Sequence, residues 1–333
     1  MARTVWLSGN EITKFITNIP TIPKTKGERG QLTINETITL TGDNSKSMWN
    51  RSNTKSILYG KDINDFEVKI YNNDILDFKG NINNVVSNNS TAEIECRSEL
   101  YKLMQMKALY ISTNKTPAEL CKDVLIYYGM PINGASFERS IDVHKYYSLT
   151  AQININLQQD TNMSVLDLVQ QLADIGCARL YYANNMFYYE AYDSTYTPPV
   201  SVSLTITDLQ SAPRTYSYEQ EKIERYQITT ITNVVTGGDI NSDAILKQMY
   251  YSSDSPIRII TGAHYIGSSY LELSAQEKEV IEVGIDKEEG YAIDLDSGFD
   301  VTYAKLGWSN KAFEVINIDN SHPFITQVTG LSV

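Results

Sequence analysis

Hydrophobic and polar positions alternate along the first third of the chain, which is the pattern of β-strands with one buried face. In FEVKIYNNDILDFKGNINNVV, residues 66–86, one alternating run precedes a turn at 72–74 and a second follows it. Further strands are predicted at 31–40 and 91–97, so the segment predicts an antiparallel meander. Gly80 stands in the middle of a predicted strand, where a glycine is either simply tolerated or marks a bulge or a sharp bend.

Two stretches in the middle of the chain change to helical spacing. In TPAELCKDVLIYYG, residues 116–129, Thr116 is a cap, a proline follows in the first turn, and Glu119 is placed to bond back to the cap. In SVLDLVQQLADIG, residues 164–176, Ser164 is a cap and the apolar positions form one stripe. Each stretch closes on a glycine, so both predict a helix with defined ends.

The second helix leads directly into a Tyr-rich hairpin, predicted at 178–191. Residues 130–160 carry few helix or strand signals and predict a polar loop. After a break at Thr197-Pro198-Pro199, alternating runs return. These later strands are predicted at 202–206, 225–235, 276–284, 298–303, 312–318 and 324–331.

This order predicts an α+β protein that is mainly β, with two sheet-built modules around an inserted helix-plus-hairpin region. We expect the first β domain at 1–110, the α+β insert at 111–197 and the second β domain at 198–333. The stretch 240–275 fits the second β domain less well and is treated as a possible insertion within it.

Composition narrows the functional classes for the 333-residue chain. The net charge of −12 and the absence of a Lys/Arg cluster argue against specific nucleic-acid binding. The 23 tyrosines favour half-buried sheets and assembly surfaces. Cys96, Cys121 and Cys177 are expected to be reduced core thiols, as in a protein folded in a cytosol. The N-terminal segment lacks a signal-peptide pattern, and no membrane span is expected.

The candidates for metal binding are few. His144, His264 and His322 are far apart in the sequence and lie outside the predicted helices, so metal ligation by them is not expected. The segments 43–45 and 239–243 carry oxygen ligands that suit calcium, but neither matches the EF-hand spacing and ordinary turns explain both.

The candidates for catalysis are equally weak. No nucleophile elbow, phosphate-binding loop or dinucleotide-binding glycine motif occurs. Asp294 with Asp296, and Glu288 with Glu289, are carboxylate pairs by proximity, yet a solvated acidic loop explains them better. We assign no catalytic residue, no cofactor-binding residue and no metal ligand, and we expect no enzyme and no cofactor.

Three parts of the chain resemble the tail (baseplate) hub proteins of long-tailed bacteriophages and related phage-tail-like particles. The first is 56–60 leading into 66–86, the second is the pair of helices with the hairpin after them, and the third is the run of strands at 298–303, 312–318 and 326–331. The likeness spans most of the chain and lies in the pattern of elements.

The resemblance implies two tail-tube-like antiparallel β-barrel domains joined by the α+β insert. Three copies would form a ring at the virion tail tip, with six similar modules facing the tail tube and a spike or central fibre below. DNA and the tape measure protein would pass through the lumen, and distal tail or baseplate proteins would be neighbours. Assembly would take place in the bacterial host cytoplasm. Within this frame we hypothesise that 66–97 forms a curved barrel wall whose bend Gly80 eases.

Three alternatives stay open at this point. A distal tail protein begins with a similar barrel but forms a hexameric ring. A tail-tip wall-degrading glycosidase would need two carboxylates lining a cleft. A carbohydrate-binding module would use exposed aromatic side chains, for which the hairpin at 178–191 is the candidate.

Overall fold

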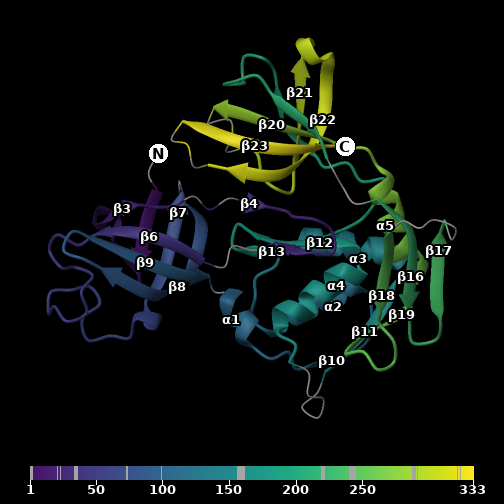
Figure 1. Cartoon of the computed structure of the whole chain (residues 1–333), viewed down its shortest axis with the longest axis horizontal. Coiled ribbons are helices and arrows are strands. Elements are labelled where there is room, and N and C mark those ends of the chain that lie inside the picture. Colours follow the sequence, from purple (N-terminus) through teal and green to yellow (C-terminus); the bar gives the residue numbers. More distant parts are fainter. Residues whose placement is uncertain are drawn as a thin grey trace. The chain divides into compact units, whose positions relative to one another are not determined.

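The structure is a computed structural model that describes residues 3–20, 22, 24–33, 37–72, 74–98, 100–155, 162–218, 222–239, 245–286, 290, 292–320, 322 and 324–333. The chain divides into two compact units (Figure 1). The N-terminal unit consists of Met1–Pro23, Ile34–Met106 and Tyr182–Asn185. The C-terminal unit consists of Lys24–Thr33, Lys107–Tyr181 and Met186–Val333.

The N-terminal unit is built on one sheet with the strand order β2-β1-β7-β8-β9-β6-β3. All the pairings in it are antiparallel, and β7, β8 and β9 form the meander that the alternating pattern predicts. The strands and short helices of this unit are β1 (Arg3–Leu7), β2 (Asn10–Glu11), β3 (Ile16–Asn18), β6 (Thr37–Asp43), β7 (Glu67–Asn72), β8 (Ile75–Ser87), β9 (Thr91–Ser98), α1 (Leu100–Gln105) and the 3₁₀ turns Thr13–Phe15 and Ile63–Asp65.

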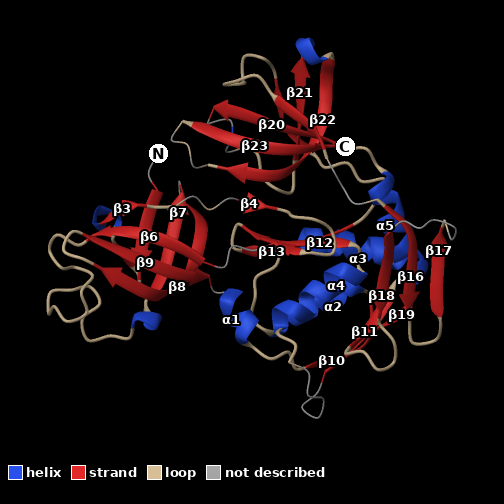
Figure 2. Cartoon of the chain, viewed as in Figure 1, coloured by secondary structure: helices blue, strands red, loops and turns tan. Residues whose placement is uncertain are grey.

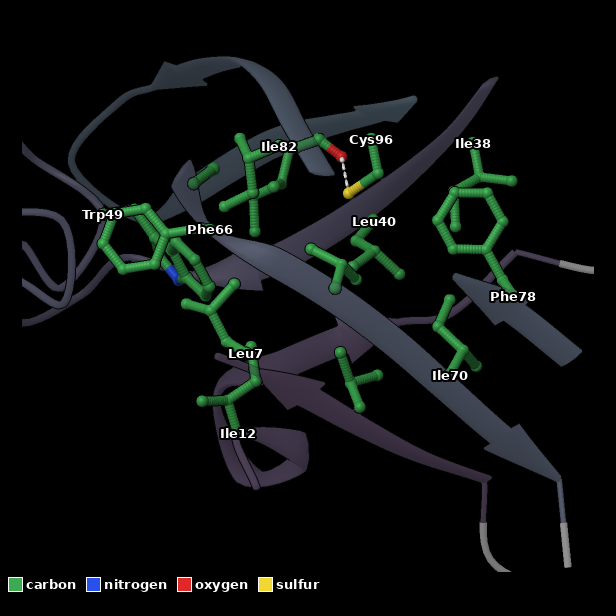
Figure 3. Close-up of a cluster of buried hydrophobic side chains, with 14 of the residues drawn as sticks. Leu7, Ile12, Ile38, Leu40, Trp49, Phe66, Ile70, Phe78, Ile82 and Cys96 are labelled. Atoms are coloured by element: carbon green, nitrogen blue, oxygen red, sulfur yellow. Dashed lines mark hydrogen bonds between the residues drawn. The ribbon is translucent and has the colours of Figure 1, made fainter. Parts of the chain in front are cut away.

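The inner face of this sheet carries the hydrophobic core of the unit (Figure 3). The alternation along β7 to β9 places every second side chain there, so the predicted buried face is confirmed. Burying one such large apolar side chain stabilises the fold by about 1.5–3 kcal/mol. The core side chains are Val5, Leu7, Ile12, Ile38, Leu40, Trp49, Leu58, Phe66, Val68, Ile70, Phe78, Ile82, Ala92, Ile94 and Cys96.

Gly80 lies where β8 is paired on both sides, opposite Val68 of β7 and Ser98 of β9. A Cβ at this position would lie 2.1 Å from the backbone oxygen of Arg97 and 2.8 Å from its carbonyl carbon. The neighbouring strand therefore approaches the backbone of β8 more closely than any side chain allows. Of the two interpretations of Gly80, this geometry favours a required glycine over a tolerated one.

The C-terminal unit holds the longer helices, and α2 (Pro117–Tyr127) packs beside α4 (Val165–Ile175) (Figure 2). Both predicted starts are confirmed, because Thr116 and Ser164 each form a capping box with the acidic residue three positions on. The stripe of α4 is fully buried, as its spacing predicts. The other helices of the unit are α3 (Gly134–Tyr146), α5 (Ala263–Ala275) and the 3₁₀ turn Ala304–Leu306.

The prediction of a loop over 130–160 is wrong for most of the range, and residues 156–160 lie outside the described residues. Asn133 caps α3 through a bond from the backbone N–H of Ser136, and β11 (Thr150–Ile155) follows. The helix shows little apolar pattern because much of its buried face is polar. Ser140 donates to the backbone oxygen of Tyr189 at 2.7 Å and accepts from the N–H of Ala191 at 3.0 Å, which attaches α3 to the hairpin.

Three small sheets surround the helices, with the orders β10-β11-β19, β13-β12-β5 and β17-β16-β18. The predicted hairpin is confirmed as β12 and β13. The single strand predicted at 225–235 is wrong, because Thr230 and Asn233 bond to each other in a turn that divides it into β16 and β17. The strands of these sheets are β5 (Leu32–Thr33), β10 (Tyr110–Lys115), β11, β12 (Ala178–Ala183), β13 (Met186–Ala191), β16 (Ile223–Thr229), β17 (Val234–Gly238), β18 (Ile245–Tyr250) and β19 (Ile257–Thr261).

A second large sheet has the order β14-β21-β22-β23-β20-β15, with β4 paired to β22. Its last strands agree with the predictions for 298–303, 312–318 and 324–331. Residues 245–275 contribute no strand to it and form β18, β19 and α5 instead. The strands of this sheet are β4 (Lys24–Thr25), β14 (Val200–Leu204), β15 (Arg214–Ser217), β20 (Glu279–Asp286), β21 (Gly298–Tyr303), β22 (Trp308–Asp319) and β23 (Ile325–Ser332).

Residues 24–33 belong to the C-terminal unit although the chain on both sides of them belongs to the N-terminal unit. This segment, here called the thread, pairs with β22 through β4 and runs parallel to β12 through β5. The single strand predicted over 31–40 is therefore wrong, since its two ends pair in different units. The fold class, α+β and mainly β, is confirmed.

Candidate functional site

A network of buried charges joins the thread to the rest of the C-terminal unit. The Nζ of Lys26 lies 3.1 Å from Glu190 Oε2 on β13 and 3.0 Å from Glu314 Oε1 on β22. Arg179 on β12 pairs with the same oxygen of Glu314 at 2.5 Å, and Tyr181 donates to Glu190 Oε1 at 2.7 Å. The side chain of Lys26 is only 1% exposed, so these contacts replace its hydration.

The electrostatics of this network favour its charged form. Burial alone would raise the pKa of Glu314, but Arg179 and Lys26 hold that pKa well below its ordinary value. Burial alone would lower the pKa of Arg179, but Glu314 and Glu190 raise it. Each charge is therefore stabilised by its partners, and removing one of them would leave an uncompensated ion in the interior.

A cleft of about 870 Å³ opens beside the network, and Arg179, Glu190 and Glu314 line it. Tyrosine rings flank its cations, with the guanidinium of Arg139 4.0 Å from the ring of Tyr196. The volume lies within the range typical of ligand sites. This cleft is the main candidate for a binding site in the described part of the chain.

Three cations of the cleft form no ion pair among the described residues: Arg29, Arg139 and Lys278. Arg29 donates instead to the backbone oxygens of Glu190, at 2.7 Å, and of Cys177, at 3.5 Å. Burial, and then the neighbouring Arg179, lower the pKa of the Arg29 guanidinium. Burial also lowers the pKa of Lys278. The chemistry of this surface suits an anion better than a nucleophilic or acid–base reaction.

The three histidines are not brought together. His144 is fully buried in α3, where its Nε2 bonds to the backbone oxygen of Gly176 at 3.0 Å and its Nδ1 accepts from the N–H of Ala118. Burial lowers the pKa of His144 to about 4. His264 lies in α5, so the expectation that the histidines lie outside helices is wrong for both. His322 is exposed.

The three cysteines are free and buried, as predicted. Burial raises the pKa of the Cys96 and Cys177 thiols to about 12 and that of Cys121 well above its ordinary value. At neutral pH these groups are neutral thiols packed as apolar side chains, so they are poor nucleophiles.

The candidate carboxylates do not form a catalytic pair in the described residues. The backbone of Asp294 accepts from the N–H and hydroxyl of Ser297, at 3.1 and 2.7 Å, in a turn before β21. Burial and then Asp294 and Glu190 raise the pKa of Asp296, which does not line the cleft. Glu288 and Glu289 lie outside the described residues.

The candidate calcium segments are accounted for only in part. Asp43 accepts from the N–H of Ser45 at 2.9 Å and Asn44 accepts from the N–H of Trp49, so their oxygens hold a turn. The segment 239–243 lies almost wholly outside the described residues. No group of three or more His, Cys, Asp or Glu side chains suited to a metal occurs where the structure is described.

Three of the four tyrosines of the hairpin are buried, and Tyr182 is half-buried. Tyr181 and Tyr189 are fully buried and Tyr188 nearly so, and the rings of Tyr181 and Tyr188 stack at 5.0 Å. The hairpin therefore does not present these rings to a sugar. Separately, none of the helices in the described ranges combines the length and the apolar character needed to cross a membrane.

Sequence reasoning missed the charge network and the cleft. Arg179 and Glu190 could have indicated the network from the sequence, because each interrupts an otherwise apolar strand and the two strands form one hairpin. Lys26 and Glu314 gave no comparable signal, since their burial depends on a pairing of segments 288 positions apart.

Comparison with known proteins identifies the fold. No protein-family model and no curated protein sequence matches the chain. The 43 kDa tail protein of prophage MuSo2 from Shewanella oneidensis is 12% identical, with a TM-score of 0.59 over 99% of this chain and 97% of that one. A tail protein from Neisseria meningitidis MC58 is 10% identical, with a TM-score of 0.57 over 99% and 96% of the two chains. The prophage tail protein gp18 from Listeria monocytogenes EGD-e is 10% identical, with a TM-score of 0.54 over 99% and 94%.

The chain thus has the fold of phage tail proteins along nearly its whole length. At the level of the fold, this confirms the resemblance to phage tail proteins predicted from the sequence.

Proposed function

We propose that this protein is a structural hub of a phage tail tip. The observation that carries the proposal is the likeness to tail proteins over 99% of the chain. A structural role also agrees with the described residues, in which the candidate catalytic groups hold turns or pack in the interior.

The proposed assembly is a homotrimeric ring. Each copy contributes two curved sheets as tail-tube-like barrel modules, so three copies present six modules to the tail tube. The two large sheets support this reading, since each ends in strands that pair on one side only among the described residues, β2 and β3 in one sheet and β14 and β15 in the other. Unpaired strand edges favour pairing with another chain. We keep residues 1–110, 111–197 and 198–333 as the proposed domains.

Mass and shape in solution test this assembly. Native mass spectrometry of the purified chain is expected to give three copies, and negative-stain images to show rings with a central hole. Six copies per ring would favour the alternative, a distal tail protein. A monodisperse monomer at micromolar concentration would contradict both.

The proposed partners are the tail tube protein, distal tail or baseplate proteins, a spike or central fibre, and the tape measure protein. DNA would pass through the ring without specific binding, in keeping with the net charge of −12. Co-expression with the tube protein from the same genome should give a complex that survives size-exclusion chromatography. The proposed location is the virion tail tip, after assembly in the bacterial host cytoplasm.

We further propose that the protein is not an enzyme. A glycosidase requires two carboxylates flanking the scissile bond, and in the cleft Glu190 and Glu314 are both held by cations. Purified protein incubated with peptidoglycan is expected to release no soluble glycan above the level of a heat-treated sample. Release that is lost in Glu190→Gln would establish catalysis.

A further inference from the structure

The described residues that line the cleft include five cations and five acids, but the two signs are placed differently. Glu190 and Glu314 are engaged by Lys26 and Arg179. Glu28 and Glu277 are exposed, and Asp193 accepts from the N–H and hydroxyl of Thr195. The acids are therefore paired with cations, exposed to solvent or held by hydrogen bonds in a turn.

Most of the remaining cations have no ion-pair partner among the described residues. Lys247 pairs with Asp174, whereas Arg29, Arg139 and Lys278 are half-buried and pair with no carboxylate in the described ranges. Burial lowers the pKa of Lys278 most; nearby Glu314 raises that pKa, whereas Arg179 and Arg29 repel the lysine and lower it. Glu314 is shared with Lys26 and Arg179, so it balances these cations only in part, and an anion placed among them would reduce their mutual repulsion.

The lining also offers contacts for a polypeptide. Leu246, Lys247 and Gln248 belong to β18, which is the last strand of its sheet and has one edge that no described strand pairs with. Extended peptides add to such edges through backbone hydrogen bonds, while pockets select their side chains. The half-buried ring of Tyr196, beside Arg139, adds a flat surface for packing.

We propose that the cleft binds an acidic, extended segment of a partner protein, with its carboxylates directed at Arg29, Arg139 and Lys278. A long polyanion such as a nucleic acid fits less well, because it would have to pass the exposed Glu28 and Glu277 and a chain of net charge −12. This proposal is independent of the hub assignment, since it concerns binding by the isolated chain and not ring formation.

Fluorescence anisotropy tests the proposal with a labelled short oligoglutamate peptide, and with an oligoglutamine of the same length for comparison. Wild-type protein at low salt is expected to bind oligoglutamate and not oligoglutamine, and to release it as salt increases. Lys278→Gln and Arg139→Gln should each weaken binding about tenfold, as expected for the loss of a hydrogen bond to a charged group. Lys55→Gln, an exposed lysine of the N-terminal unit, is the matched control and should bind as wild type.

Three results would overturn the proposal. Oligoglutamate that fails to bind wild-type protein at about 1 mM excludes a useful site. Equal binding by Lys278→Gln, Arg139→Gln and wild type would place the peptide elsewhere. Oligothymidylate of the same charge binding at least as tightly would identify a phosphate ligand instead of a carboxylate one. The comparison of the three ligands uses wild-type protein alone, so it holds even if a variant fails to fold.

Discussion

Replacing Gly80 with alanine tests whether the close approach of two strands determines the N-terminal sheet. The new Cβ would lie 2.1 Å from the backbone oxygen of Arg97, a distance that real Cβ atoms essentially never show. The obstacle is backbone, which cannot move aside as the end of a flexible side chain can. Strand β9 must therefore shift away from β8 near Ser98, where the two strands pair.

The structure gives the size of the effect. The shift weakens one or two ladder hydrogen bonds, at about 0.5–1.5 kcal/mol each, and overpacking adds about 1–3 kcal/mol. We therefore expect Gly80→Ala to lower the free energy of unfolding by about 1.5–6 kcal/mol. Gly80→Val adds a branched side chain at the same point and should impair folding or ring closure outright.

Hydrogen-exchange mass spectrometry in increasing urea resolves the effect by segment, which a chain of two units requires. Amides of β8 and β9 should lose protection in Gly80→Ala while those of α2 and α4 keep it. Gly134→Ala is the matched control, because a Cβ there meets nothing within 4 Å, and it should be neutral or slightly stabilising. Unchanged protection of β8 and β9 in Gly80→Ala would refute the reasoning.

Three further predictions concern the C-terminal unit. Glu314→Gln should lower the free energy of unfolding, measured in urea, by about 3–5 kcal/mol, because it leaves the buried charge of Lys26 without one partner. The control is Glu138, which forms an ion pair at the surface, and Glu138→Gln should lower it by less than about 1 kcal/mol. His144, with its pKa lowered to about 4, stays neutral in the folded chain while the unfolded chain takes up a proton near pH 6.5, so stability falls as the pH falls. Protonation of His144 in the unfolded chain should lower the free energy of unfolding by about 2 kcal/mol between pH 7 and pH 5. If the urea midpoints of His144→Gln change with pH as much as those of the wild type, this prediction is wrong. Thr116→Ala removes the cap of α2 and should lower the free energy of unfolding, measured by thermal denaturation, by about 0.5–2 kcal/mol. Thr116→Ser keeps a capping hydroxyl and should largely avoid this loss.

Elements whose signals are local could be predicted from the sequence. The alternation along β7 to β9 and the caps at Thr116 and Ser164 depend on neighbouring residues, and the structure has them where the pattern indicates. Helix α3 was missed because Ser140 and His144 on its buried face read as solvent-exposed positions, although both form hydrogen bonds in the interior.

Elements fixed by distant partners could not be predicted in the same way. The run at 31–40 is β-prone throughout, and only the pairing of Leu32 with Leu180 and of Ile38 with Cys96 divides it between two units. The cleft has the same origin, since Arg29, Arg139 and Lys278 come together through the fold alone. The spacing of these residues along the chain does not indicate that they lie close together in the fold.

The thread has a consequence for how the chain matures during synthesis. Lys26 leaves the ribosome well before its partner Glu314, which is 288 positions further on. At about 5–20 residues per second, the wait between the two is on the order of 15–60 s. Throughout that interval β4 has no β22 to pair with, so its pairing is completed only once β22 has been made, and a nascent chain halted before β22 should leave β4 open to protease.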